Sequence, residues 1–315
     1  MALTRAAVLL LAYVAWFIAQ PAQAVRPGQV SSTAEATCGY RAIAAQHPDP
    51  KLRNPDDLAA KLCRWQNSLP RDYAAARPLI DQGETYSAFF YVNARTHYID
   101  AALKKAAADG VTQVVVLGAG FDSRAYRFRA SHPQLQFYEV DLPATIEAKK
   151  VRVAEALGAL PDYVRYAPID FNTQKLEEVL LPLGYDPKQR GFFLLEGVVM
   201  YVVEAGNVAT FEFIRRNSAP GSVVVYDYVL RRVIEGDTKG LYAAAYLAFA
   251  VERVGEPYIF GWTPAEAAAW AGKLGFSVVE DVGDKELGRR HLTGSNGRLD
   301  GRLLDWHRLM EVRVP

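Results

Sequence analysis

Residues 111–127 read VTQVVVLGAGFDSRAYR, and this stretch decides the fold. The three valines before its leucine are typical of a buried central strand in a parallel sheet. Gly118 and Gly120 follow at once, and glycine lets the backbone turn sharply and come close to a ligand. Asp122 and Ser123 come next, and either side chain can cap a helix that begins there. Strand, glycine turn and helix start, in this order, are typical of the nucleotide crevice of open α/β sheets.

The chain after this stretch alternates between strands and helices, which predicts a doubly wound, mostly parallel sheet. Further strands are expected at 135–140, 164–169, 192–195, 221–229 and 276–282, with a seventh at 310–314. The alternation breaks at 230–262, which has no strand pattern and contains an Ala-, Tyr- and Phe-rich helix. We interpret 230–262 as an insertion that covers the carboxyl edge of the sheet.

Charge and composition exclude several classes of protein. The 315 residues carry 36 Lys+Arg against 35 Asp+Glu, so no basic field points to nucleic acid. Half of the residues are hydrophobic, which excludes global disorder. The five histidines are scattered and no CxxC or HExxH motif occurs, so no metal site is predicted.

The first 24 residues differ from the rest. Arg5 is their only charge, an apolar run follows at 6–19, and the segment ends in Ala-Gln-Ala. This pattern favours a secretory signal peptide cleaved after Ala24, with an uncleaved membrane anchor as the alternative. Either interpretation predicts export or attachment to a membrane.

Residues 25–110 are expected to form a helical N-terminal segment ahead of the sheet domain at 111–315. A helix start is predicted at 54–57 (NPDD), because proline and acids favour the first turn. Cys38 and Cys63 both fall in this segment. They are expected to pair if the chain is exported and to stay free thiols otherwise.

Acidic residues end three consecutive strands after the glycine turn. Asp141 closes the second strand, 23 positions after Gly118, where a carboxylate can accept hydrogen bonds from ribose hydroxyls. Asp170 closes the third strand and Glu196 the fourth. Because parallel strands end at one edge of a sheet, we expect these carboxylates around one crevice.

Four motifs carry a resemblance to a known family. LGAGFDSRAYRF, FYEVDLP, PIDF and LLEGVVMY occur in that order, supported by ARTHYID at 94–100 and GEPYIFG at 255–261. In this combination the chain resembles the class I S-adenosylmethionine-dependent methyltransferases of the leucine carboxyl methyltransferase-like group. The resemblance runs from about residue 54 to the C-terminus. It implies a Rossmann-like sheet of seven strands with the last antiparallel, and members of the group are expected in the cytoplasm.

The resemblance also implies a role for individual residues. It implies that S-adenosylmethionine is bound by Arg95 at its carboxylate, by Gly118 and Gly120 at its methionine part, by Asp141 at the ribose, by Asp170 and Phe171 at the adenine, and by Glu196 near the sulfonium. Asp122 is a further cofactor-binding candidate, and Tyr201 is the catalytic candidate near the acceptor.

Methyl transfer to an oxygen of a small molecule or of a polypeptide is therefore the expected activity. A carboxylate acceptor needs no base, whereas a hydroxyl needs one nearby, for which His97 and His291 are candidates. A nicotinamide-dependent oxidoreductase is one alternative, although Ser123 departs from the third glycine of its fingerprint. A non-catalytic exported binding protein that keeps the fold is the other.

Overall fold

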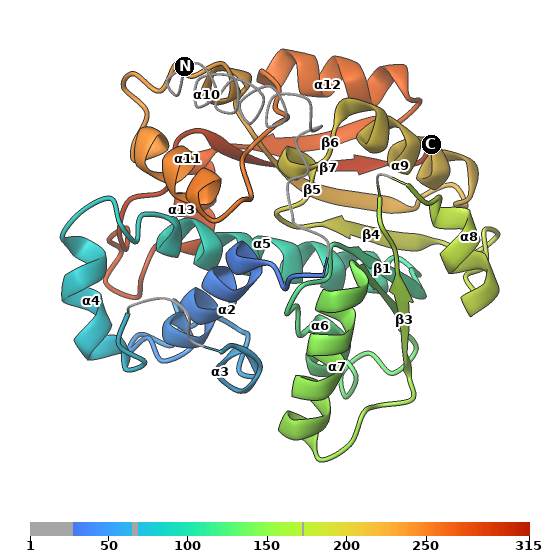
Figure 1. The fold of residues 1–315 in the computed structure, drawn as a ribbon, viewed down its shortest axis with the longest axis horizontal. Coiled ribbons are helices and arrows are strands. Elements are labelled where there is room, and N and C mark those ends of the chain that lie inside the picture. Colours follow the sequence, from blue (N-terminus) through green and yellow to red (C-terminus); the bar gives the residue numbers. More distant parts are fainter. Residues whose placement is uncertain (1–27, 65–68, 172) are drawn as a thin grey trace, which may run out of the picture.

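The computed structural model describes residues 28–64, 69–171 and 173–315 (Figure 1). The leader predicted at 1–24 lies outside the described residues. In the part of the chain that is described, no helix has the length and apolar character needed to cross a membrane.

Seven strands and a larger set of helices make up the described chain. The strands are β1 (Gln113–Leu117), β2 (Gln136–Asp141), β3 (Val164–Pro168), β4 (Gly191–Leu195), β5 (Val223–Val229), β6 (Ser277–Val282) and β7 (His307–Arg313). The helices are α2 (Ser32–Ala44), α3 (Ala59–Leu62), α4 (Tyr73–Asp81), α5 (Ala88–Ala108), α6 (Arg124–Arg127), α7 (Pro143–Leu157), α8 (Leu176–Leu180), α9 (Glu204–Arg216), α10 (Arg231–Ile234), α11 (Ala244–Arg253), α12 (Pro264–Lys273) and α13 (Asp284–His291), with 3-10 turns at Leu181–Leu183 and Val199–Tyr201.

The strands form one sheet in the order β3-β2-β1-β4-β5-β7-β6. β1 pairs in parallel with both β2 and β4, while β7 runs antiparallel to β5 and β6. This confirms the predicted class I pattern of seven strands with an antiparallel last strand. The order reverses beside β1, so a crevice is expected at the carboxyl ends of β1 and β4.

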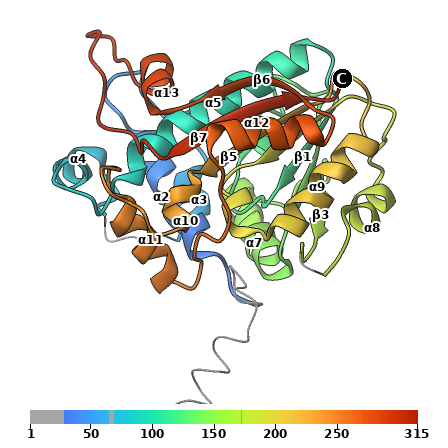
Figure 2. The ribbon, with the colours of Figure 1, turned by 90° about the horizontal axis from the view of Figure 1, so that it is seen from above.

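Alternating side chains of the strands build two hydrophobic cores, one on each face of the sheet. Val114 and Val116 of β1 belong to the core that also holds α2 and α5, whereas Val115 and Leu117 belong to the core with α8, α9 and α12. Figure 2 shows α5 and α13 on one side of the sheet and α9 and α12 on the other. All five β1 residues are buried, as the valine run predicted.

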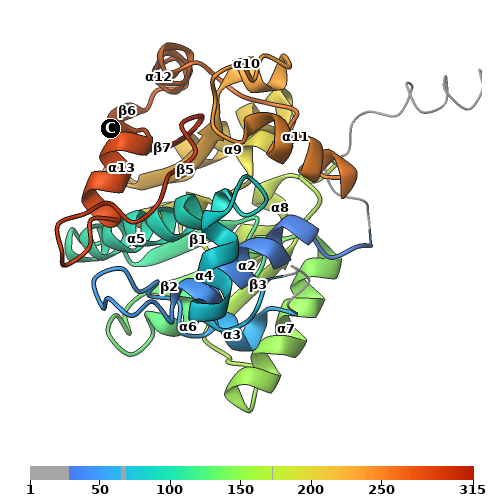
Figure 3. The same ribbon diagram turned by 90° about the vertical axis from the view of Figure 1, so that its left-hand side faces the viewer.

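The N-terminal helices and the insertion lie at the same end of the molecule. α2 and α11 are neighbours there in both Figure 1 and Figure 3. α12 begins after Thr263, whose hydroxyl accepts from the Glu266 amide in a capping box, as expected from Thr-Pro at this position. Leu230 and Trp262, at the two ends of the insertion, form an isolated bridge, so both ends meet at the sheet.

Two sequence predictions about the N-terminal segment need correction or completion. The helix expected to begin at 54–57 begins at Ala59, with Leu58 at its N-cap position, and the Asp56 carboxylate just before it accepts a hydrogen bond from the Ala59 amide. Cys38 and Cys63 are both buried, and no disulfide joins them in the described structure. Burial raises the pKa of Cys38, and the neighbouring Cys63 adds to this effect.

Candidate functional site

A cavity of about 620 Å³ opens at the carboxyl ends of β1, β2 and β4. This volume is in the range of small-molecule sites. One end of it is bounded by the glycine turn and the acids that follow these strands, and the other by apolar residues of α5, α11 and the loop before β7. All nine candidate site residues line it, namely Arg95, Gly118, Gly120, Asp122, Asp141, Asp170, Phe171, Glu196 and Tyr201.

The glycine turn after β1 requires glycine for two separate reasons. Gly118 and Gly120 have φ values of +67° and +42°, which other residues rarely adopt. A Cβ on Gly118 would also lie 2.3 Å from Cγ2 of Val198. Beneath the turn, Lys149 donates to the Ala119 carbonyl at 3.3 Å and so fixes the loop.

Asp122 is the cap of the helix that follows the turn. Its Oδ1 accepts from the Arg124 amide at 2.7 Å, and its other oxygen contacts the Arg124 guanidinium. Ser123 holds the N-cap position but does not cap α6, since its hydroxyl donates to Asp56 at 2.5 Å. The sequence allowed either residue to cap the helix, and in the structure it is Asp122 that accepts from the helix amide.

Asp141 at the end of β2 is held by two backbone amides. Its Oδ2 accepts from Gly120 and its Oδ1 from Leu142, both at 2.6 Å. Burial raises the pKa of this carboxyl, although both amides oppose the shift. The remaining lone pairs of its oxygens are free to accept hydrogen bonds from the cavity. At the next strand end, Asp170 and Phe171 line the same side of the cavity.

Arg95 and Glu196 belong to a buried ionic network across the floor of the cavity. Arg95 Nη1 donates to Asp227 at 2.6 Å, and Arg124 Nη1 donates to Glu196 Oε2 at 2.7 Å. Burial alone would raise the pKa of Glu196, but the guanidiniums of Arg124 and Arg95 outweigh it and lower the pKa. Glu196 is therefore an anion at neutral pH.

One oxygen of Glu196 keeps hydrogen-bonding capacity. Glu196 Oε1 is 2.9 Å from Arg95 Nε, yet the pair lacks hydrogen-bond geometry, and this buried oxygen has no hydrogen-bond partner in the described structure. A donor that enters the cavity beside Glu196 would satisfy it.

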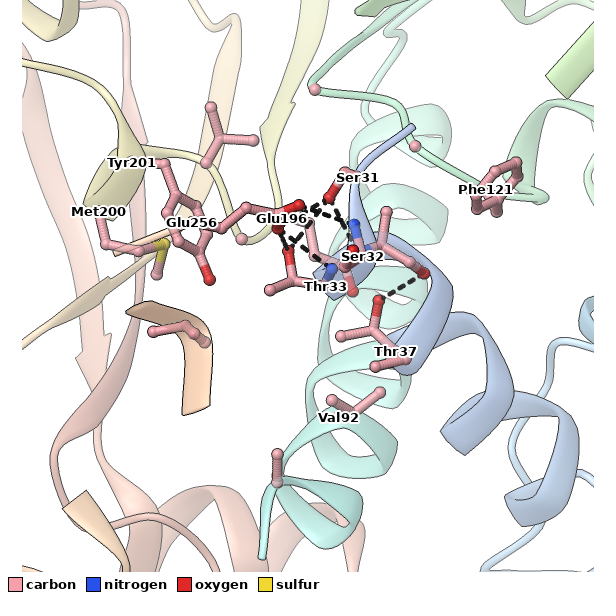
Figure 4. Close-up of a pocket in the computed structure, with 18 of the residues that line it drawn as sticks. Ser31, Ser32, Thr33, Thr37, Val92, Phe121, Glu196, Met200, Tyr201 and Glu256 are labelled. Carbon is pink, nitrogen blue, oxygen red and sulfur yellow. Dashed lines mark hydrogen bonds between the residues drawn. The ribbon is translucent and has the colours of Figure 1, made fainter. Parts of the chain in front are cut away.

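The start of α2 closes the cavity against the insertion. The Glu256 carboxylate accepts from the amides of Ser32 (2.7 Å) and Thr33 (3.1 Å) and from the hydroxyls of Ser31 and Thr33. Figure 4 shows Glu256 reaching from the side of Tyr201 and Met200 across to these three residues. Two segments that are far apart in the sequence thus form one wall.

The family of the protein follows from comparison with known sequences. A family model described as leucine carboxyl methyltransferase matches residues 34–215, more than half of the chain. The chain belongs to this family. A protein of Mycolicibacterium paratuberculosis, provisionally named an S-adenosyl-L-methionine-dependent methyltransferase, is 30% identical over 257 residues, which cover 79% of this chain and 83% of that protein. A protein of Mycolicibacterium smegmatis with the same provisional name is 29% identical over 210 residues, which cover 65% of this chain and 69% of that protein.

Among solved structures, magnesium protoporphyrin IX methyltransferase from Synechocystis PCC 6803 aligns with a TM-score of 0.45 and 11% identity, over 76% of this chain and 92% of that one. The family and its relatives make the present chain an S-adenosylmethionine-dependent methyltransferase.

The charged residues that line the methyltransferase's cavity are complementary to the charges of S-adenosylmethionine. The described residues that line it include five carboxylates (Asp122, Asp141, Asp170, Glu196 and Glu256) and two guanidiniums (Arg41 and Arg95). An excess of acid suits a cofactor whose ammonium and sulfonium charges outnumber its carboxylate. The Glu196 oxygen that lacks a hydrogen bond can accept one from a donor such as an ammonium group.

Away from the strand ends, the methyltransferase's cavity is lined by apolar and aromatic residues. Of the insertion's aromatic residues, Tyr246 and Tyr258 line it, whereas Trp262 packs against Trp270 in the core. Tyr201 lies against Tyr258 with ring centroids 5.4 Å apart. Burial raises the pKa of Tyr201, and Tyr258 and Glu256 raise it further, so its hydroxyl stays protonated.

Neither of the two histidines that the sequence offered as candidates for a base lines the cavity of this methyltransferase. His97 and His291 stack on each other with centroids 6.3 Å apart and do not line the cavity, whereas His307 does. His307 was missed because the last strand was predicted to begin at residue 310, and it begins at His307 itself. Glu256 was visible in the GEPYIFG motif, but nothing local in the sequence signals that it binds the start of α2.

Proposed function

We propose that this methyltransferase transfers a methyl group to an oxygen, in a carboxylate or a hydroxyl, of a small apolar acceptor. The observation that carries the proposal is a single cavity in which acids at the strand ends of β1, β2 and β4 adjoin an aromatic chamber beneath α11. An oxygen acceptor agrees with the description of the family, which names a carboxyl group.

Each strand end would bind one part of the cofactor. Gly118 and Gly120 leave room for the backbone to approach the methionine part. Asp141 would accept from the ribose, Asp170 and Phe171 would contact the adenine, and Asp122 and Glu196 would face the ammonium side. Arg95 would meet the carboxylate. Bound there, S-adenosylmethionine supplies an electrophilic methyl group.

The protein's own part is to orient the acceptor and to exclude water. Proximity and alignment supply much of the rate of such a transfer. The Glu256 contacts with Ser32 and Thr33 hold one wall of the cavity together. Because its pKa is raised, Tyr201 would donate a hydrogen bond to the acceptor rather than remove a proton.

The experiment uses the full chain, S-adenosylmethionine labelled in its methyl group, and panels of aromatic hydroxyl compounds, carboxylic acids and amines. The labelled products are then treated with strong base, which releases methanol from methyl esters but leaves methyl ethers and N-methyl groups intact. Mass spectrometry separates the last two. Label on oxygen supports the proposal, and label found on nitrogen alone contradicts it. Cofactor binding without transfer to any acceptor would favour a non-catalytic binding protein.

The leader remains a separate proposal. We propose that residues 1–24 direct export or hold the chain at a membrane, on the pattern of one arginine, an apolar run and Ala-Gln-Ala. N-terminal sequencing of protein from the native cell tests this: a mature chain that begins at Val25 identifies a cleaved signal. An intact N-terminus in the soluble fraction contradicts both forms of the proposal.

A further inference from the structure

His307 is a buried imidazole that borders the acceptor chamber without a hydrogen bond. Only 6% of the residue is exposed, and neither Nδ1 nor Nε2 has a partner in the described structure. Its backbone pairs with Val229 at the start of β7, so a rigid strand positions the ring. Buried polar atoms are nearly always paired, so two free ring nitrogens beside a cavity point to a ligand that pairs with them.

The groups packed against His307 keep it neutral and fixed. Tyr91 of α5 lies with its ring centroid 4.6 Å away, Trp306 at 4.3 Å and Tyr258 at 6.1 Å. The Tyr91 hydroxyl donates its hydrogen bond to Asp227, so it does not donate one to the imidazole of His307. Burial lowers the pKa of His307 well below its usual value, and Arg95 on the same side lowers it further. The imidazole is therefore neutral at neutral pH, and its basic ring nitrogen has a lone pair that can accept the hydrogen bond of a hydroxyl group.

Among the residues that the structure describes, no positive charge without an acidic partner lines the cavity to receive a carboxylate from the acceptor. Among the described residues that line the cavity, Arg41 pairs with Asp56 at 2.8 Å and donates to the Phe121 carbonyl. Arg95 pairs with both Glu196 and Asp227, and the proposed function assigns its remaining capacity to the carboxylate of the cofactor. A carboxylate brought into this space would meet Glu196 and Glu256 and lose its hydration without a counter-charge.

Aromatic and thioether side chains form the rest of the chamber. Tyr40, Tyr91, Met200, Tyr246 and Tyr258 line it together with leucines. Such walls suit a ring, because aromatic pairs add attraction beyond the area they bury. In Figure 4, Met200 and Tyr201 lie across the cavity from Thr37 and Phe121.

We propose that the acceptor is an apolar aromatic hydroxyl compound and that His307 is the base that accepts its hydroxyl proton. This inference rests on the proposed oxygen methylation and deepens it. In the step, the acceptor oxygen forms a bond to the methyl carbon while the carbon–sulfur bond breaks and its electron pair stays on sulfur. The hydroxyl proton passes to a free ring nitrogen of His307, and then to solvent.

The first test is binding and does not require turnover. The full chain with S-adenosylhomocysteine is titrated calorimetrically with two matched pairs, 4-phenylphenol against 4-phenylbenzoate and 4-ethylphenol against 4-ethylbenzoate. At least one phenol should bind about tenfold or more tightly than its carboxylate. NMR of the five histidines should show the His307 ring resonance move on addition of that phenol. Equal or tighter binding of the carboxylates, no binding of either phenol, or an unmoved His307 resonance overturns the proposal.

The second test separates a base from a packing residue. His307→Gln should lower kcat for the bound phenol by about 100-fold or more, the usual range for a lost general base. The same variant should lose less than about tenfold with 2-nitro analogues, whose hydroxyl is already ionised at the assay pH and needs no base. His132→Gln, outside the cavity, is the matched control and should keep full activity. Equal losses of kcat with both acceptors would make His307 a positioning residue and overturn its role as base.

The two proposals fail differently. If label appears only in base-labile esters, oxygen methylation stands and the hydroxyl acceptor with His307 as base is wrong. If no oxygen is methylated, the proposed function itself fails. Circular dichroism of His307→Gln shows whether the variant folds, and the binding comparison on the wild-type chain holds even if it does not.

Discussion

The carboxylate of Glu256 accepts a 2.7 Å hydrogen bond from the backbone amide of Ser32, although 224 positions separate the two residues. Three further donors from Ser31 and Thr33 share the same carboxylate. Glu256 is 4% exposed, so this contact is sheltered from water. It joins the first helix that the structure describes to the insertion, and it makes the wall of the cavity depend on both.

Glu256→Ala should therefore loosen this wall. Loss of charge-assisted hydrogen bonds at a buried site predicts a fall of about 2–3 kcal/mol in the free energy of unfolding, together with weaker cofactor binding. Urea denaturation and calorimetric titration with S-adenosylmethionine measure the two effects. Glu252→Ala on the exposed side of α11 is the control. If Glu256→Ala behaves like this control, Glu256 does not hold the wall.

Asp141→Ala should weaken binding of S-adenosylmethionine by about 1–3 kcal/mol, the usual cost of losing hydrogen bonds to a charged group. Part of this loss will come from the glycine turn, because Asp141 also fixes the Gly120 amide. Isothermal titration gives the affinity, and Asp162→Ala at an exposed position is the comparison. An affinity unchanged from wild type would remove Asp141 from the site.

Arg95→Lys should also weaken cofactor binding, by about tenfold, because an ammonium cannot reproduce the planar fork of a guanidinium. Arg95 contacts Glu196 through Nε and Asp227 through Nη1, two directions that one lysine nitrogen cannot cover. Arg129→Lys, which is exposed, should bind as wild type does. A tight complex with Arg95→Lys would mean that positive charge alone is sufficient at this position.

The buried pair of Glu139 and Lys149 predicts a pH dependence of stability. Their charged atoms lie 2.8 Å apart with both side chains fully buried. Burial raises the pKa of Glu139 to about 7 from 4.5, even with Lys149 beside it. Between these values the folded chain keeps a proton that the unfolded chain releases. The contribution of this proton to the free energy of unfolding is therefore complete below about pH 4.5, and it is lost as the pH rises through about 7.

Urea denaturation from pH 4.5 to 8 measures this effect against the double variant Glu139→Gln/Lys149→Met. The free energy of unfolding of the wild type should fall relative to that of the double variant as the pH rises, and the difference should level off above about pH 7. Parallel curves over the whole range would show that Glu139 does not keep its proton in the folded chain.

The sheet was predictable because its signals are local. A valine run marks β1, glycines with positive φ mark the turn after it, and acids mark the ends of β2 and β4. Each of these follows from neighbouring residues in the sequence, and the parallel topology then brings them to one edge. For this reason most of the residues that line the cavity at the strand ends were predicted from the sequence.

The rest of the cavity was not predictable in the same way, because its contacts join segments that are distant in the sequence. Glu256 meets Ser32, and Arg95 meets Asp227 132 positions away, with no local pattern that announces either pair. His307 was missed because Arg308 interrupts the apolar pattern at the start of β7, so the strand was placed too late. The two histidines that the sequence favoured stack on each other outside the cavity.

Isothermal titration of the full chain with S-adenosylmethionine, with NADH as the parallel ligand, tests the central claim most directly. We predict binding of S-adenosylmethionine with a dissociation constant in the micromolar range, about −8 kcal/mol, and no measurable binding of NADH. Binding of NADH alone, or of neither ligand by a folded chain, would contradict the assignment of this cavity to a methyl donor.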